Sequence, residues 1–303
     1  MCNREKTLQV QKGVRESHWE LIGGILAVLA ALSFALTLIA LKKALQTTSS
    51  LTVTIASVAP AAIIFVPAVI FLAPPHMVSL NTIVVLIVAG LMAPTSARFF
   101  RFMSVDKMGV APAAPIGGTS ALFSAVIAAA VLGEVITVQI GIGTLAVVAG
   151  VIILSLGEGK TQLSKAGVTM ALISAVTFGG ASVARKIGVE AASSPLLGAA
   201  IGATVATISY AILASATNQT IDHPRSWNRF TYATAIFSSV SLIFIFSALF
   251  LERVVIVQPL LSTSPLYQLL FSWIFLKKVE HVSSSIVIAG ITVVLGSILV
   301  VTG

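Results

Sequence analysis

Two arginines lie in a long apolar stretch and are the side chains of this sequence best suited to bind an anion. Arg98 and Arg101 follow a run without charged residues that begins after Lys43. Their spacing of three residues places both guanidinium groups on one face of a helix. If that helix crosses a membrane, a guanidinium near its centre costs about 2.5–3.5 kcal/mol and is retained where it faces a cavity, a carboxylate or a bound anion. Both arginines are therefore expected to bind an anionic group, and extension of the side chains to the membrane interface is the alternative.

Two other stretches combine prolines and glycines with hydroxyl, amide and phenol groups that suit a small polar ligand. The side chains expected to contact such a ligand, besides the two arginines, are Thr119, Ser120, Gln258, Ser262, Ser264 and Tyr267. The residues expected to bend the helices or to act in gating are Pro112, Pro115, Gly117, Gly118, Pro259 and Pro265. A proline leaves a carbonyl without its partner one turn earlier, which a membrane tolerates only beside protein or water. We therefore expect two bent helices around a polar centre, with packing kinks between close helices as the alternative.

The acidic residues suggest structure rather than chemistry. Glu134 and Glu280 each lie beside a predicted helix start, where a carboxylate satisfies free backbone N–H groups, so both are assigned to structural capping. No Asp or Glu lies near the middle of an apolar stretch, and the four histidines flank such stretches. The sequence therefore predicts no metal site, no cofactor and no enzymatic activity, and it offers no buried group for proton coupling.

The composition excludes an ordinary soluble domain. Of 303 residues, 57% are hydrophobic and 9% are charged, against roughly 25% charged in an average soluble domain. The net charge of +8 is spread over loops without a stripe of basic and aromatic residues, so nucleic acid is not an expected partner. The expected surroundings are a lipid bilayer.

The spacing of the charged clusters predicts ten membrane-spanning helices. About 20 apolar residues cross a bilayer core as a helix. The intervals between clusters give spans near residues 21–41, 51–72, 80–104, 108–132, 138–157, 166–186, 194–214, 230–251, 254–276 and 283–302. Residues 1–20 form a polar N-terminal segment. The predicted fold class is an all-α integral membrane protein.

An internal repeat divides the chain into two halves of five helices. At an offset of 146, residues 105–157 overlay residues 251–303 without a gap and pair Glu134 with Glu280. Further upstream the offset is 144, and it pairs Phe34 with Phe178. The expected divisions are a first repeat over 21–157, an inter-repeat loop over 158–165 and a second repeat over 166–303.

Five spans per half make the two repeats enter the membrane from opposite sides. Inverted repeats are characteristic of secondary transporters that work by alternating access. A duplication that only enlarged a helical bundle is the alternative. The overlay also places Arg98 about 5 Å and Arg101 about 10 Å from the midpoint of the third span, at a rise of 1.5 Å per residue.

The doubled pattern of glycines and glutamates resembles the EamA-like family of the drug/metabolite transporter superfamily. In the first half it consists of Gly133 and Glu134, Gly143, and Gly150 followed by Val151. In the second half it consists of Pro265, Glu280, Gly290 and Gly296. Val279 departs from the family pattern, which has glycine before the second glutamate. Ser33 and Phe34 also depart from it, because the family often has tryptophan and glycine there.

The resemblance implies a ten-helix carrier of the plasma or inner membrane. Such carriers export amino acids and other small metabolites through a central cavity between the halves, and both their termini are cytoplasmic. The charge distribution does not independently favour this orientation. It would put on the inner side only Arg4, Lys6, Lys12, Arg15, Arg185, Lys186 and Arg253.

The sequence thus predicts a secondary transporter of facilitated or exchange type. Its expected partner is a small-molecule metabolite such as an amino acid or a related carboxylate. A drug or organic-cation exporter is one alternative, and a lipid scramblase or structural membrane protein is another. No feature of the sequence defines an oligomeric state.

Replacing Arg98 with glutamine is expected to weaken transport of an anionic substrate, because the substitution removes a positive charge near the predicted centre. The measurement is substrate flux through a folded, membrane-inserted Arg98→Gln variant. Unchanged flux with intact membrane insertion would remove this role from Arg98.

Overall fold

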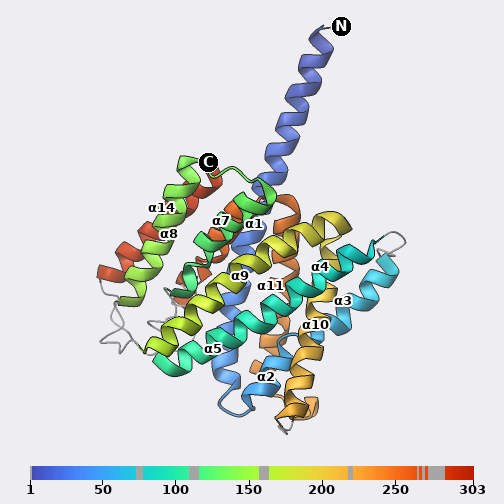
Figure 1. Ribbon diagram of the computed structural model, residues 1–303, viewed down its shortest axis with the longest axis vertical. Helices are drawn as coiled ribbons and strands as arrows, with labels where there is room; N and C mark the ends of the chain where they lie inside the picture. Colours follow the sequence, from blue (N-terminus) through green and yellow to red (C-terminus); the bar gives the residue numbers. More distant parts are fainter. Residues whose placement is uncertain are drawn as a thin grey trace.

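A computed structural model describes residues 2–72, 78–108, 116–156, 164–217, 221–264, 266–267, 270–271 and 284–303. The first half contains α1 (Cys2–Ala44), α2 (Ser50–Ala56), α3 (Ala59–Leu72), α4 (Leu80–Gly90), the π-helical segment η1 (Leu91–Ser96), α5 (Ala97–Met108), α7 (Ser120–Leu132) and α8 (Val138–Leu156). The second contains α9 (Lys165–Ala192), α10 (Pro195–Ala216), the short 3₁₀ turn η2 (Pro224–Ser226), α11 (Arg229–Leu251), α12 (Val254–Leu261) and α14 (Ser284–Thr302). Figure 1 shows these helices as one bundle from which the start of α1 projects.

The outer surface of the bundle is apolar, as a membrane protein requires. Six of the described helical stretches are long and apolar enough to cross a membrane, and three shorter apolar helices accompany them. Large apolar side chains are exposed on the outside, for example Phe71 at 83% and Ile212 at 63%, whereas soluble monomers rarely expose large contiguous apolar patches. Each of the ten predicted spans contains a described helix. The predicted all-helical membrane fold of two repeats is confirmed.

Several helix boundaries differ from those predicted. Helix α1 is continuous from Cys2, so residues 2–20 of the polar segment are helical. The second span is divided at Ser57, between α2 and α3, and the third is interrupted at η1, where Ala93 has extended backbone angles (φ −149°, ψ 129°). Charges and apolar length locate a span but do not reveal such interruptions, which depend on partners elsewhere in the fold.

The helix contacts follow the two-fold symmetry of the repeats. Helix α1 packs on α11 and α12, and the corresponding helix α9 packs on α4, α5 and α7. The symmetric pairs α8 with α14, α3 with α10, and α7 with α12 join the halves. These main helix contacts therefore follow the symmetry of the repeats.

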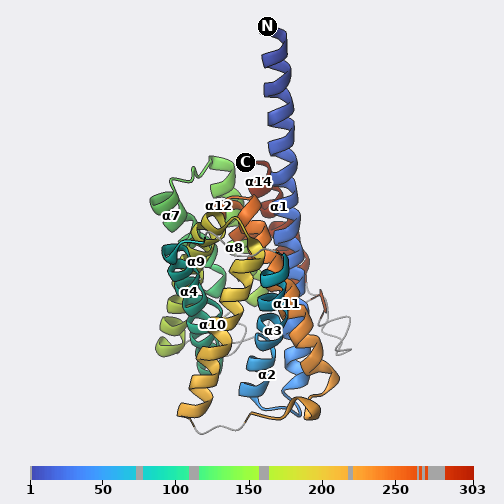
Figure 2. The same cartoon turned by 90° about the vertical axis from the view of Figure 1, so that its right-hand side faces the viewer.

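The two repeats run in opposite directions. Gly23, near the start of the apolar part of α1, packs against Glu252, and Lys186, near the end of α9, donates a hydrogen bond to the Glu252 carbonyl at 3.0 Å. The C-terminus lies at the end of the bundle from which α1 projects (Figures 1 and 2). At that end Glu252 is 4% exposed, and burial raises the pKa of its carboxyl group, whereas the hydrogen bond from the Arg253 amide lowers it.

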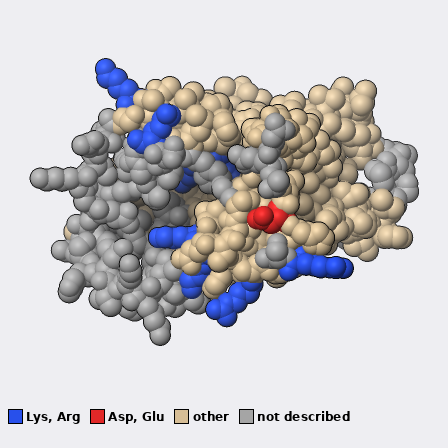
Figure 3. Space-filling model, turned by 90° about the horizontal axis from the view of Figure 1, so that it is seen from below, with Lys and Arg blue, Asp and Glu red and all other residues tan. Residues whose placement is uncertain are grey.

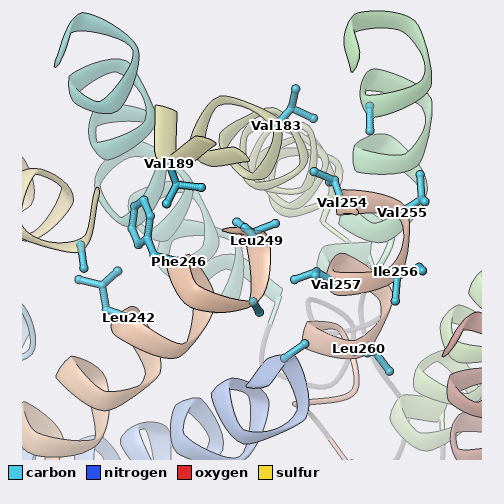
Figure 4. Packing of buried hydrophobic residues seen from close by; sticks show 14 of the residues in the cluster. Val183, Val189, Leu242, Phe246, Leu249, Val254, Val255, Ile256, Val257 and Leu260 are labelled. Carbon is cyan, nitrogen blue, oxygen red and sulfur yellow. The ribbon is translucent and has the colours of Figure 1, made fainter. Parts of the chain in front are cut away.

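The largest apolar cluster joins α9, α11 and α12, and Phe246 lies within it (Figure 4). Its ring occupies the place where a side chain on Gly198 of α10 would lie, since a Cβ there would be 2.5 Å from the ring. Most other buried residues are alanine, valine, serine or threonine. Small residues let membrane helices approach closely and gain packing contacts.

We expect Gly143→Ala to destabilise the protein, because α8 and α14 cross at this glycine. A Cβ on Gly143 would lie 2.6 Å from the Gly296 carbonyl oxygen and 2.9 Å from the Val300 nitrogen. Overpacking of this kind costs about 1–3 kcal/mol. The measurement is thermal unfolding of the purified variant in detergent.

Gly141→Ala on the same helix is the matched control. A Cβ at Gly141 would meet only Ile136 Cγ2, at 4.0 Å, so this variant gains the same helix propensity without the clash. Equal stability of the two variants would contradict the close crossing of α8 and α14.

Candidate functional site

A cavity of about 100 Å³ lies between the two halves, where the sequence predicted a polar centre. Helices α1, α5 and α7 contribute to it from the first half, and α9, α11 and α12 from the second. Its lining consists of Ala31, Phe34, Arg101, Gly117, Gly118, Ser120, Phe178, Ser182, Arg185, Ile245, Gln258, Leu261, Ser262 and Ser264. The repeat pair Phe34 and Phe178 lines the cavity from both halves. The site therefore lies at the interface of the repeats.

Arg101 lines this cavity, and a glycine makes room for its side chain. A Cβ on Gly117 would lie 3.0 Å from Arg101 Nη1, so the guanidinium lies against the backbone at Gly117. No described residue forms a hydrogen bond or an ion pair with Arg101. Within the described part of the chain, this guanidinium therefore lines the cavity without a partner.

Arg185 is a second cavity arginine, although the sequence analysis counts it among the charges of the inner side, at the end of the span predicted over 166–186. It is 6% exposed, and its Nη2 donates to the Ala93 carbonyl at 2.6 Å. Its guanidinium also lies over the Phe246 ring, 5.5 Å from the centroid. Lys186, counted with the same charges, is buried as well.

This difference has a physical reason, because charged residues do not themselves end a helix. Helix α9 continues to Ala192 and ends at Ser193, which adopts left-handed backbone angles (φ 48°). Ser194 then caps α10, and Pro195 is its first residue. This Ser-Ser-Pro sequence is the signal that marks the end of α9 and the start of α10. Serine is preferred at helix N-caps, and proline is preferred in the first helical turn.

The interruption at η1 supplies the acceptor that positions Arg185. Because the helix is broken there, the Ala93 and Pro94 carbonyls are available to the second half of the chain. The Ala93 carbonyl accepts from Arg185, and the Pro94 carbonyl accepts from the Tyr210 hydroxyl at 2.9 Å. The sequence analysis missed Pro94, although a proline inside an apolar stretch is a recognised indication of a kink.

Arg98 lies near the cavity but is not among the residues that line it. Its Nη1 donates to the Ser57 hydroxyl at 2.7 Å, at the break between α2 and α3. The expected role of Arg98 in the pathway stays a prediction.

A chain of neutral polar groups crosses the cavity wall from one half to the other. The Ser182 hydroxyl donates to Gln258 Oε1 at 2.6 Å, and Gln258 Nε2 donates to the Ser120 hydroxyl at 3.4 Å. All three residues are buried. Gln258 has both donor and acceptor capacity, so this chain can exchange hydrogen bonds with a polar ligand.

Of the other residues predicted to contact substrate, Ser262 and Ser264 line the cavity, while Thr119 and Tyr267 do not. The Thr119 hydroxyl donates to the Ile116 carbonyl at 2.6 Å, and Tyr267 lines a separate groove beside α14. Of the predicted bending residues, Gly117 and Gly118 line the cavity, and Pro259 is buried within α12. Four predicted residues lie outside the described residues: Pro112, Pro115, Pro265 and Glu280.

Helix α12, which carries Gln258, is capped by a carboxylate from the other half. Glu134 Oε1 accepts from the Val254 amide at 3.0 Å, and Oε2 accepts from the Val255 amide at 2.9 Å. Gly133 precedes it with left-handed backbone angles (φ 68°, ψ 21°) and ends α7. Residues with a Cβ rarely adopt those angles, so Gly133 allows the turn that brings Glu134 to α12.

The described lining of the cavity contains no acidic side chain. In the described part of the chain, no three His, Cys, Asp or Glu residues are grouped to hold a metal ion. Among the described residues of the lining, the charged groups are Arg101 and Arg185.

The end of the molecule opposite the N-terminus is basic. In Figure 3, which views that end, Lys and Arg atoms outnumber Asp and Glu atoms among the residues shown in colour. The exposed basic residues at the helix ends and loops there are Lys42, Lys107, Lys165, Arg225 and Arg229. Such a surface raises the local concentration of anions.

An all-helical membrane protein of two inverted repeats, with a polar cavity between them, has the architecture of a secondary transporter. The sequence profile of the EamA-like transporter family matches residues 21–156 and again residues 165–302. The chain therefore belongs to the EamA-like transporter family, within the drug/metabolite transporter superfamily.

The fold also has a counterpart among solved structures. One protein of known crystal structure superposes with a TM-score of 0.73 at 18% sequence identity, covering 93% of this chain and 96% of the other. At that identity the similarity establishes the fold alone. No match was found among curated proteins.

Glu134→Ala should destabilise the protein by about 1–3 kcal/mol, because it leaves two buried amide donors of α12 without an acceptor. The stability of Glu134→Gln should lie between that of Glu134→Ala and that of the wild type. Its amide oxygen can still accept a hydrogen bond but carries no negative charge. The measurement is thermal or denaturant unfolding in detergent. If Glu134→Ala is as stable as the wild type, the cap does not hold α12.

Proposed function

We propose that this protein exports a small organic anion, such as an amino acid or a related carboxylate, through the central cavity. The observation on which this proposal rests is the position of Arg101, which lines the cavity without a described partner. An intramembrane guanidinium is costly unless it is paired or hydrated. Arginine also binds carboxylates through two parallel hydrogen bonds, so a carboxylate substrate would compensate this cost.

We further propose transport by alternating access. The inverted repeats and their symmetric contacts support two related states in which one half tilts against the other. The ligand groups of the cavity come from both halves, so such a tilt would change access while the site stays at the interface. The proposed role involves no covalent chemistry.

Facilitated diffusion or exchange is the form of transport that the cavity supports best. No acidic side chain is present in its described lining, and proton coupling usually uses a buried carboxylate or histidine. We assign both termini to the cytoplasmic side on the basis of the family resemblance. They lie at one end of the bundle (Figures 1 and 2).

Arg101→Gln should reduce the flux of a carboxylate substrate about tenfold or more, because a hydrogen bond to a charged group contributes about 1.5–3 kcal/mol. Counterflow of labelled amino acids and small carboxylates into proteoliposomes measures this effect. The control is Lys107→Gln, which removes an exposed positive charge from the same helix.

The outcomes separate this proposal from its alternatives. Flux that is lost in Arg101→Gln and retained in Lys107→Gln supports anion transport through the cavity. Transport of organic cations without flux of carboxylates would contradict anion transport and indicate a drug exporter. Movement of labelled phospholipid without metabolite flux would indicate a scramblase.

A further inference from the structure

We propose that the cavity selects organic dianions, in the form of a dicarboxylate or a phosphate monoester, and that Arg185 binds the second negative charge. This inference rests on the proposed function and specifies its substrate class. It requires Arg185, which the sequence analysis did not include in the site.

Two positive charges lie at the cavity. Arg101 from the first half and Arg185 from the second both line it. A monoanion would neutralise only one of these charges, whereas a dianion neutralises two and relieves more of their repulsion.

Among the described residues, no carboxylate forms an ion pair with either arginine of the lining. Glu134 is occupied by two amides of α12. Glu252 lies at the terminal end of the bundle, where its carboxylate accepts from the Arg253 amide at 2.7 Å. The salt bridges of the described residues involve Lys186 and Arg253, and neither Arg101 nor Arg185 takes part in one.

Both guanidinium groups are held in place before a ligand binds. Arg185 is held by the Ala93 carbonyl and the Phe246 ring, which leaves its other N–H groups without described acceptors. Arg101 lies against Gly117. Side chains that are already fixed lose less conformational entropy when the ligand binds. Guanidinium groups also match the geometry of planar carboxylates and tetrahedral phosphates.

The uncharged lining residues and the cavity volume limit the size and polarity of the rest of the substrate. Ser120, Ser182 and Gln258 provide neutral hydrogen-bonding groups, whereas Phe34 and Phe178 provide apolar surface. The cavity volume of about 100 Å³ suits a short carbon skeleton with a few hydroxyl groups.

The first test compares charge states on the wild-type protein in detergent, with ligand affinity measured by thermal stabilisation. Succinate is compared with its monoamide, succinamate. Glycerol 3-phosphate is compared with its methyl diester, which keeps one negative charge. We expect at least one dianion to bind about tenfold or more tightly than its monoanionic partner.

The ligand pair with the larger dianion-to-monoanion affinity ratio shows whether the second charge belongs to a carboxylate or to a phosphate. If glycerol 3-phosphate is preferred, its affinity should also fall as the pH decreases from 7.5 to 5, because the second phosphate pKa is about 6. Monoanions that bind as tightly as both dianions would overturn the proposal.

The second test locates the second charge. Arg185→Gln should reduce the dianion-to-monoanion affinity ratio to near one, while Lys107→Gln should leave it unchanged. Arg185→Lys keeps the charge and should retain most of the preference if Arg185→Gln fails to fold. A ratio that is unchanged in a folded Arg185→Gln variant, or that is lost in a folded Arg185→Lys variant, would contradict the assignment to Arg185.

The two proposals fail in different ways. A dianion preference in binding without flux of any anion into proteoliposomes would overturn the transport function but not the selectivity. Carboxylate flux that depends on Arg101 and does not distinguish monoanions from dianions would overturn only the selectivity.

Discussion

The cost of placing guanidinium groups inside a membrane bundle governs the architecture around the cavity. Arg101 and Arg185 line it without a described carboxylate partner, and such groups persist only where other interactions offset the loss of hydration. The break at η1 provides a carbonyl, Phe246 provides a ring face, and Gly117 leaves space for a side chain. Each of these local irregularities has the same consequence, which is that a positive charge is held at the interface of the halves.

The two repeats share a backbone scaffold but not the chemistry of the site. At the offset of 146, Arg101 corresponds to Ser247, and at the offset of 144, Arg185 corresponds to Leu41. Phe34 and Phe178, in contrast, are retained as a pair and line the cavity from both sides. The symmetric residues therefore belong to the scaffold that the two repeats share, while the two arginines make the distribution of charge around the cavity asymmetric.

The sequence predicted the fold well because membrane insertion leaves few alternatives for an apolar chain. Charge-free lengths and the internal repeat located the spans, and the matched Gly and polar residues located Ser120 and Gln258 in the cavity. Arg185 was missed because a charge far along an apolar helix looks the same as a charge in a loop. Its placement depends on the Ala93 carbonyl, ninety-two residues away in the chain, and no local pattern encodes that contact. The same limit applies to Arg98, whose partner Ser57 lies on another span.

The Gly133–Glu134 pair of the first half has a clear mechanical role in this structure. Gly133 allows the turn after α7, and Glu134 then holds the first amides of α12. Gln258 lies one turn further along α12 and joins Ser182 to Ser120 across the halves. Displacement of the α7–α8 turn would therefore displace Gln258 through a short, rigid helix. The motif influences the cavity without contacting it, because it fixes the position of the helix that contributes one of its walls.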